Sequence, residues 1–167
     1  MNQGVNAVIK LKLYKFIASG CGSGYAPIMP GTVGTMAIFI PVILLFNPQY
    51  YLLLSLIFFL LGVLLCKKLA TEADSDPQWI VIDEWAGLLL AMGLTYHASL
   101  PDISFDFSMV AILVLFRLFD ITKPCYIKQL ECKLTPQWGI MVDDMLAGLY
   151  AFITLMLLMI LHRTMLL

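Results

Sequence analysis

The stretch WGIMVDDMLAGLYA (138–151) joins two adjacent carboxylates to an apolar run that continues to Leu161. That run is long enough to cross a bilayer. Because ionised side chains at or within a membrane segment are costly, they usually face a partner, a cavity or a metal ion. The stretch IDEWAGLLLAMG (82–93) repeats the arrangement, with two acids followed by Ala-Gly. The sequence therefore predicts four carboxylates at two helix entrances: Asp83, Glu84, Asp143 and Asp144.

The composition is that of a membrane protein. The chain has 167 residues, of which 61% are hydrophobic and 13% are charged. This is too apolar and too poor in charge to cover an ordinary soluble domain, so we expect residues 1–167 to form a single membrane-embedded domain. A net charge of -1 without a dense Lys and Arg cluster excludes a strongly basic nucleic-acid-binding protein. The four cysteines have no CxxC spacing, which argues against zinc.

The hydrophobic runs predict an all-α integral membrane helical bundle of about four to five spanning or re-entrant helices. We place these helices at about residues 33–47, 50–66, 84–97, 107–120 and 142–161. Several runs are shorter than the roughly 20 residues of a simple span, so a re-entrant pair remains an alternative. Residues 1–20 carry lysines among periodic apolar residues, which favours an interfacial N-terminal helix. A solvated helix packed on the domain is the alternative.

The distribution of lysines predicts how the chain is oriented in the membrane. With a cytoplasmic N-terminus, most lysines lie on the inner side, and the opposite loops at 47–49 and 97–106 contain no Lys or Arg. The predicted inner lysines are Lys10, Lys12, Lys15, Lys67, Lys68, Lys123, Lys128 and Lys133. The same orientation places both acid pairs at one membrane face, where segments remote in sequence converge.

The stretch GCGSGYAPIMPGTVGT (20–35) predicts an irregular, ordered loop that leads into an apolar helix. It lacks the Gly-Lys-Ser/Thr of a Walker loop. Gly31 and Thr32 stand where free backbone N–H groups and the positive helix end would point toward a bound phosphate. The alternative is a simple helix cap by Thr32 or Thr35.

The stretch FRLFDITKP (116–124) adds two cations and one acid. Arg117, Asp120 and Lys123 are spaced i, i+3, i+6, so on a helix they follow one face before the proline. One alternative is an Arg117–Asp120 ion pair with Lys123 extending to lipid headgroups. For the acid pairs, the alternative is helix capping by Asp83 and Asp143. Capping explains one acid at each entrance and leaves the second acid unexplained.

Taken together, these stretches predict five carboxylates, one Arg, one Lys and a glycine-rich loop at a membrane surface. Hard oxygen ligands without histidine or thiolate clusters are the donors that Mg²⁺ prefers. Arg and Lys neutralise a phosphate in its transition state. The sequence therefore indicates Mg²⁺-assisted phosphoryl chemistry on a lipid headgroup.

Four motifs in order resemble the bacterial phosphatidylglycerophosphatase A family: GSGYAPIMPGTVGT (22–35), IDEWAG (82–87), FRLFDITKP (116–124) and GIMVDDMLAG (139–148). The resemblance implies a Mg²⁺-dependent lipid phosphatase of the bacterial inner membrane. It would convert phosphatidylglycerophosphate to phosphatidylglycerol at the cytoplasmic face. One departure is the segment 135–138, Thr-Pro-Gln-Trp, where the family often has Gly-Gly. This departure puts a role for that short loop in doubt and leaves the acids untouched.

The expected roles follow from the residue types. Asp83, Asp120, Asp143 and Asp144 are the predicted catalytic residues, and with Glu84 they are the predicted Mg²⁺ ligands. Asp120 serves either as a ligand or as the base that orients the attacking water, and a phospho-aspartate intermediate is the alternative. The predicted phosphate-binding residues are Gly31, Thr32, Arg117 and Lys123.

Two other functions fit parts of the pattern. The first is a phosphatase that acts on another anionic phospholipid. The second is a small cation-conducting membrane protein. A conduit needs polar groups at membrane depth or on both faces, whereas the predicted acids gather on one face. The sequence therefore favours the enzyme.

Overall fold

The computed structural model describes residues 2–69, 77–99, 104–123 and 134–165, and within these ranges it is all-helical. It contains six α-helices, two short 3-10 helices and no strand in the described residues. The α-helices are α1 (Asn2–Ala18), α2 (Pro30–Leu45), α3 (Tyr51–Leu69), α4 (Ile82–His97), α5 (Phe105–Thr122) and α7 (Pro136–Met165), and the 3-10 helices are η1 (Ser23–Tyr25) and η2 (Pro48–Tyr50). The prediction of an all-α fold is confirmed.

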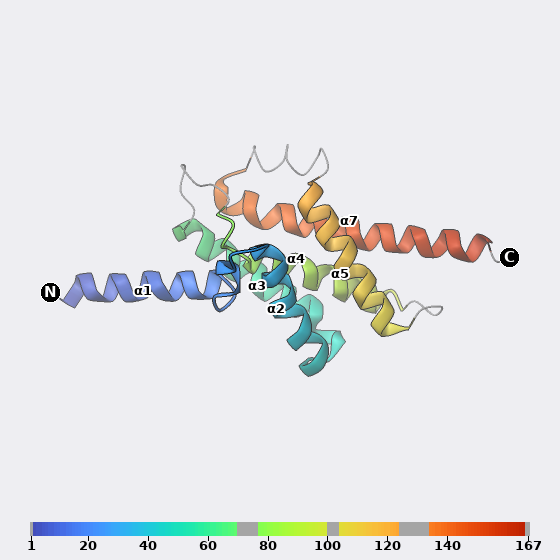
Figure 1. The fold of residues 1–167 in the computed structure, drawn as a ribbon, viewed down its shortest axis with the longest axis horizontal. Helices are drawn as coiled ribbons and strands as arrows, with labels where there is room; N and C mark the ends of the chain where they lie inside the picture. Colours follow the sequence, from blue (N-terminus) through green and yellow to red (C-terminus); the bar gives the residue numbers. More distant parts are fainter. Residues whose placement is uncertain (1, 70–76, 100–103, 124–133, 166–167) are drawn as a thin grey trace.

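Helix α4 lies at the centre of the bundle and packs against α2, α3, α5 and α7 (Figure 1). Two glycines permit the closest of these approaches. A Cβ atom at Gly87 of α4 would overlap the backbone carbonyl of Asp144, and a Cβ at Gly148 of α7 would overlap the carbonyl of Gly87. Both glycines therefore permit close packing of α4 on α7.

The main core fills the space around α4. Its largest fully buried side chains come from α3, α4 and α5, and they include Tyr51, Leu88, Leu89, Met92, Met109, Ile112 and Phe116. A buried polar contact joins α3 to α4, because the Ser55 hydroxyl donates to the Ala86 carbonyl at 2.8 Å. These contacts fix the start of α4 relative to its neighbours.

The outer faces of the bundle are strongly apolar. Side chains that are about half or more exposed include Leu56 and Leu60 of α3, Val114 of α5, and Leu157 of α7. Two segments are long and apolar enough to cross a membrane, Pro48–Leu69 and Gln137–Met165. The other three predicted spans are present as helices of 16 to 18 residues, so the number of true spans stays a prediction.

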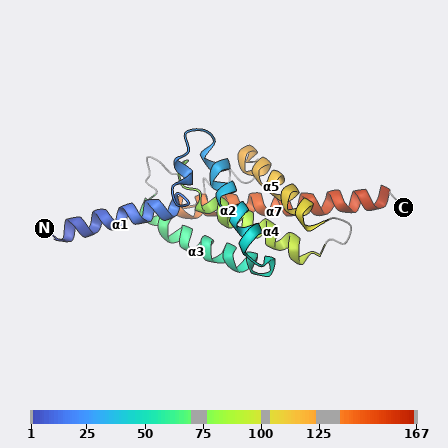
Figure 2. The same ribbon diagram turned by 60° about the horizontal axis from the view of Figure 1, so that its bottom comes forward.

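Helix α1 extends away from the bundle at the opposite end from the last turns of α7 (Figure 2). Its side chains from Val5 to Leu11 are exposed all round. Only its last turns reach the body of the protein, where Tyr14, Ile17 and Ala18 join a second core cluster with Leu65 of α3. The helix is confirmed, and its interfacial location stays a prediction.

The prediction that Asp143 and Asp144 stand at a helix entrance is wrong. Helix α7 begins at Pro136, so both acids lie about two turns inside it. Thr135 to Trp138 are too polar to extend the apolar run, so the hydrophobic stretch starts later than the helix does. The same finding removes helix capping as an explanation for Asp143, because an interior residue has no free first-turn N–H group beside it.

Candidate active site

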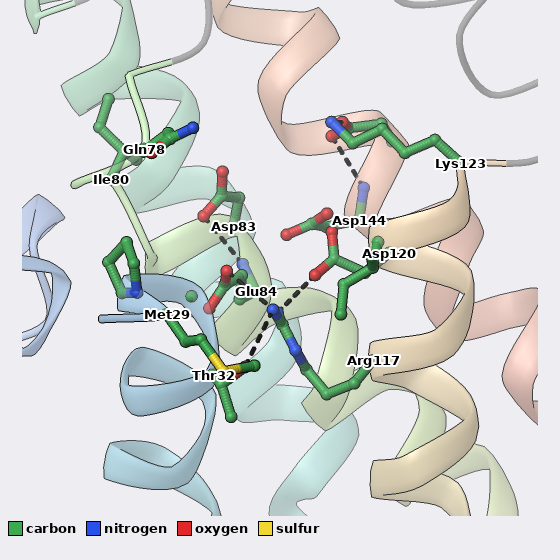
Figure 3. Close-up of a pocket in the computed structure, with 14 residues that line it drawn as sticks. Met29, Thr32, Gln78, Ile80, Asp83, Glu84, Arg117, Asp120, Lys123 and Asp144 are labelled. Atoms are coloured by element: carbon green, nitrogen blue, oxygen red, sulfur yellow. Dashed lines mark hydrogen bonds and ion pairs between the residues drawn. The ribbon is translucent and has the colours of Figure 1, made fainter. Parts of the chain in front are cut away.

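One pocket of about 330 Å³ collects every residue that the sequence predicts as part of the site (Figure 3). It lies where α2 and α4 begin, α5 ends, and α7 passes. We call it the acidic pocket. The predicted residues that line it are Gly31, Thr32, Asp83, Glu84, Arg117, Asp120, Lys123, Asp143 and Asp144. Met29, Pro30, Gln78, Ile80 and Ile121 complete the lining and were not predicted.

The four paired acids are buried. Asp83 and Glu84 occupy the first turn of α4 and are 6% and 8% exposed, and Asp143 and Asp144 are each 4% exposed. In both pairs the first carboxylate accepts a hydrogen bond of 2.9 Å from the backbone amide of the second acid. The close approach of α7 to Gly87 brings the two pairs to the same pocket.

Arg117 joins two of the acids. Its Nη1 lies 3.1 Å from Glu84 Oε1, and it also pairs with Asp120 one turn further along α5. Figure 3 shows the guanidinium directed at both carboxylates. The Arg117–Asp120 ion pair proposed as an alternative is therefore present, and Glu84 adds a partner that this alternative does not include. Within the described residues, Arg117 Nε is buried without a hydrogen-bond partner.

Thr35 is a site residue that the sequence reading treated only as a possible cap. Its Oγ1 lies 3.0 Å from Glu84 Oε2 and accepts a hydrogen bond from Arg117 Nη1 at 3.2 Å. Thr32 Oγ1 lies 3.5 Å from Arg117 Nη2. The spacing of the two threonines by three residues was the available signal, since it puts both on one helix face.

The N-terminus of α2 opens on the acidic pocket without a side-chain cap. Met29 precedes it in the left-handed conformation at φ 52°, and Pro30 is its first residue. Helix capping by Thr32 or Thr35 is thus wrong, because both lie inside the helix. The amides of the first turn have no intrahelical acceptor and carry the positive end of the helix dipole. A Cβ at Gly31 would overlap the Glu84 carboxylate and stand 3.0 Å from Arg117 Nη2.

Lys123 ends α5 and reaches across to α7. It caps α5 in the left-handed conformation at φ 35° and forms an ion pair with Asp143. Its side chain is 27% exposed, so it borders the open side of the pocket. The alternative in which Lys123 extends to lipid headgroups does not describe this geometry.

The acidic pocket has an excess of negative charge, with five carboxylates and two cations among its described lining residues. Hard carboxylate oxygens are the donors that Mg²⁺ prefers, so the chemistry of the site fits this ion. In the described residues, however, no three His, Cys, Asp or Glu side chains already stand as a ligand set. Asp120 and Asp143 each already pair with a cation through one carboxylate oxygen, Asp120 with Arg117 and Asp143 with Lys123.

Other predicted features lie elsewhere. The Trp85 Nε1 donates to the Gly34 carbonyl at 2.8 Å, and its ring packs edge-on against Phe58, away from the acidic pocket. It therefore joins α4 to α2 and α3.

Two cysteines and two lysines of the predicted inner side lie outside the described residues: Cys125, Cys132, Lys128 and Lys133.

Comparison with known proteins identifies the relatives of this chain. Residues 16–159 match the phosphatidylglycerophosphatase A family. The phosphatidylglycerophosphatase A of Haemophilus influenzae is 37% identical over 158 residues, which cover 91% of this chain and 92% of that protein. The Escherichia coli enzyme of the same name is 35% identical over 140 residues, 81% of this chain and 77% of that protein.

A third relative carries another name. The putative phosphatidylinositol-3-phosphatase of Bacteroides thetaiotaomicron is 33% identical over 145 residues, which cover 82% of this chain and 87% of that protein. No solved structure matches the chain. The family match covers the pocket-lining residues of all four helices.

Proposed function

The chain belongs to the phosphatidylglycerophosphatase A family of lipid phosphatases, and from this membership we propose that it hydrolyses phosphatidylglycerophosphate to phosphatidylglycerol and phosphate. One observation carries the proposal. Nine residues predicted as a phosphoryl-transfer site, spread over more than a hundred positions of sequence, line a single pocket.

The phosphate-binding end of the pocket is formed by α2 and α5. The free amides at Gly31 and Thr32 donate to the phosphate oxygens, and the helix dipole favours their charge. Arg117 supplies a planar donor fork, whose Nε has no hydrogen-bond partner in the described residues. Lys123, at the open side, supplies a second positive charge. These fixed donors therefore stabilise the negative charge that develops on the phosphoryl oxygens in the transition state.

The acids on α4 and α7 act on the attacking water. An acid paired with Arg is a weak base, which disfavours Asp120 as the proton acceptor. Asp144 is buried and makes no ion pair within the described residues. We assign the proton acceptor to Asp144. The water oxygen bonds to phosphorus and its proton passes to the Asp144 carboxylate. The P–O bond to the glycerol breaks as the leaving oxygen takes up a proton from solvent, and Asp144 returns its own proton to solvent.

A Mg²⁺ ion is the cofactor of the proposal. The residues that would hold it are Asp83, Glu84, Asp120 and Asp143, which leaves Asp144 beside them as the proton acceptor. When bound, Mg²⁺ neutralises phosphate charge and polarises the phosphoryl oxygens. The support is the charge excess and the oxygen-only donor set of the acidic pocket. The same excess makes an incoming phosphate unfavourable without a cation, since like charges would meet in a buried site.

The proposed location is the bacterial inner membrane, with the acidic pocket facing the cytoplasm. Lysines near the pocket end of the bundle support this orientation. Lys67 and Lys68 end α3, and Lys15 of α1 stands over the Trp79 ring close to the start of α4. Arg163, near the end of α7, lies at the other end of the bundle and is the exception.

The second candidate substrate is another anionic phospholipid, because one relative is named as a putative phosphatidylinositol-3-phosphatase. Both lipids present a phosphate monoester, which is the group that the acidic pocket suits. Cation conduction is less well supported, because the five acids meet at one end of the bundle.

Purified protein in detergent micelles tests the proposal. Phosphate release is measured with phosphatidylglycerophosphate, phosphatidic acid and phosphatidylinositol 3-phosphate, each with and without Mg²⁺. We expect phosphatidylglycerophosphate with Mg²⁺ to give the highest kcat/KM. If either other lipid gave a higher kcat/KM, that lipid would be the preferred substrate. If no lipid released phosphate, the proposal that the protein is a lipid phosphatase would be contradicted.

A further inference from the structure

A second, mainly apolar cavity of about 250 Å³ adjoins the acidic pocket between α2 and α5. We call it the α2–α5 groove. It is lined by Thr32, Thr35 and Met36 of α2 and by Leu113, Val114 and Arg117 of α5. In both helices the spacing places the lining residues on one face, so the two faces form opposite walls of the groove.

The groove changes from polar to apolar with distance from the acids. Helix α2 begins at the acidic pocket and α5 ends there, so rising numbers in α2 and falling numbers in α5 lead away from it. Thr32 and Arg117 line both cavities. Met36 and Leu113 lie about one helical turn further from the acids. This gradient suits a ligand with a phosphate at one end and hydrocarbon at the other.

The apolar end of the groove is open to the outer surface of the bundle. Val114, which lines the α5 wall, is 61% exposed. Met36 and Leu113, the other apolar lining residues, are half-buried. Helix α2 packs on α4 and η1, and α5 packs on α4 and α7. In the described residues, α2 and α5 meet mainly through the contacts of Arg117 with Thr32 and Thr35, at the polar end of the groove.

We propose that the α2–α5 groove binds the glyceride end and the first acyl-chain methylenes of the lipid substrate while the phosphate occupies the acidic pocket. The inference rests on the proposed function and adds the route by which the lipid enters, sideways between the two helices. Continuity of the two cavities through Thr32 and Arg117 supports it. Binding energy from the chain then holds the phosphate in place, as remote substrate groups do in other enzymes.

A tryptophan at position 114 tests the groove. Val114→Trp fills the groove from its exposed wall, and Leu56→Trp places the same ring on the exposed face of α3 as the control. The readout is the ratio of kcat/KM for long-chain phosphatidylglycerophosphate to kcat/KM for the same headgroup without acyl chains. We expect the ratio to fall at least about tenfold in Val114→Trp, because several buried methylenes lose their contacts. The control ratio should remain at the wild-type value.

A photoreactive lipid supplies a measurement that does not depend on turnover or on a variant. Wild-type protein is irradiated with a phosphatidylglycerophosphate that carries a diazirine near the carbonyl end of one chain, and adducts are mapped by mass spectrometry. Adducts at Met36, Leu113 or Val114 support the groove. Adducts confined to α3 or α7, or an unchanged ratio in active Val114→Trp, would overturn it. An absence of phosphate release by wild type would instead refute the proposed function. The positions of the adducts would still show whether the lipid chain binds in the α2–α5 groove.

Discussion

Arg117 Nη1 lies 3.1 Å from Glu84 Oε1 and thereby ties the end of α5 to the first turn of α4 inside the acidic pocket. Both side chains are mostly buried, with 16% and 11% of their surface exposed. Thr35 contacts both of them from α2. The three side chains thus fix the relative positions of three helices at the place where the phosphate is proposed to bind.

Replacement of Arg117 by lysine keeps the charge and removes the donor fork. Lysine cannot contact Glu84, Asp120 and a phosphate together, because its ammonium is a single point charge. Loss of such a donor typically lowers kcat ~100-fold or more. We expect Arg117→Lys to show that loss in phosphate release, with a thermal midpoint closer to wild type than that of Arg117→Ala. A rate close to wild type would mean that only the charge matters at this position.

The acids on α4 and α7 are tested by Asp83→Asn and Asp143→Asn. Each change keeps the size of the side chain and removes one negative charge from the acidic pocket. We expect phosphate release to be abolished while the protein still inserts into membranes. Asp106→Asn is the matched control, because Asp106 is an exposed acid at the far end of α5. Near-normal turnover in either pocket variant would remove that residue from the site.

The helices were predictable because apolar runs mark them. Helices α2, α3, α4 and α5 begin and end within three residues of their predicted bounds. Helix α7 begins six residues before its predicted start because Pro136 to Gly139 continue the helix through a polar approach. Hydrophobicity marks where a helix becomes buried or lipid-facing, and it says little about a polar first turn.

The residues of the site were predictable from charge that an apolar protein would otherwise avoid, as at Asp83 and Asp143. Their partners were harder to predict. Thr35 contacts Glu84 from 49 positions away, and Lys123 pairs with Asp143 across two helices. Such contacts depend on how the helices pack, which in turn depends on the glycine contacts of α4 and α7. Spacing within one helix cannot reveal them.

A methyl group at position 31 tests the close contact between α2 and the acids. A Cβ there would overlap the Glu84 carboxylate and crowd Arg117. We therefore expect Gly31→Ala to lower kcat/KM ~10-fold or more, since a small misplacement of reacting groups is costly. Val33→Ala, on the exposed side of α2, is the control and should keep wild-type kinetics. Equal kinetics in both variants would show that Glu84 and Arg117 can move without loss.

Removal of divalent cations tests the proposed cofactor. Exhaustive chelation should lower phosphate release ~100-fold or more, because a metal ion contributes several kcal/mol of charge stabilisation. Added Mg²⁺ should restore the rate. Ca²⁺ should restore it poorly, because its longer and less regular coordination suits a different geometry. Full activity after chelation would rule out the metal and leave Arg117 and Lys123 as the neutralising charges.

The packing of α4 on α7 is tested by Gly148→Ala. Its Cβ would overlap the Gly87 carbonyl, so the two backbones must separate. Over-packing of this kind typically lowers the free energy of unfolding by ~1–3 kcal/mol. Thermal unfolding in detergent should show the decrease, and phosphate release should fall with it, because Asp144 lies one turn before Gly148 and would move away from Asp83. Val110→Ile adds the same single methyl group on the exposed face of α5 and should change neither measurement. A loss of stability without a loss of activity would show that the acids keep their positions when these helices separate.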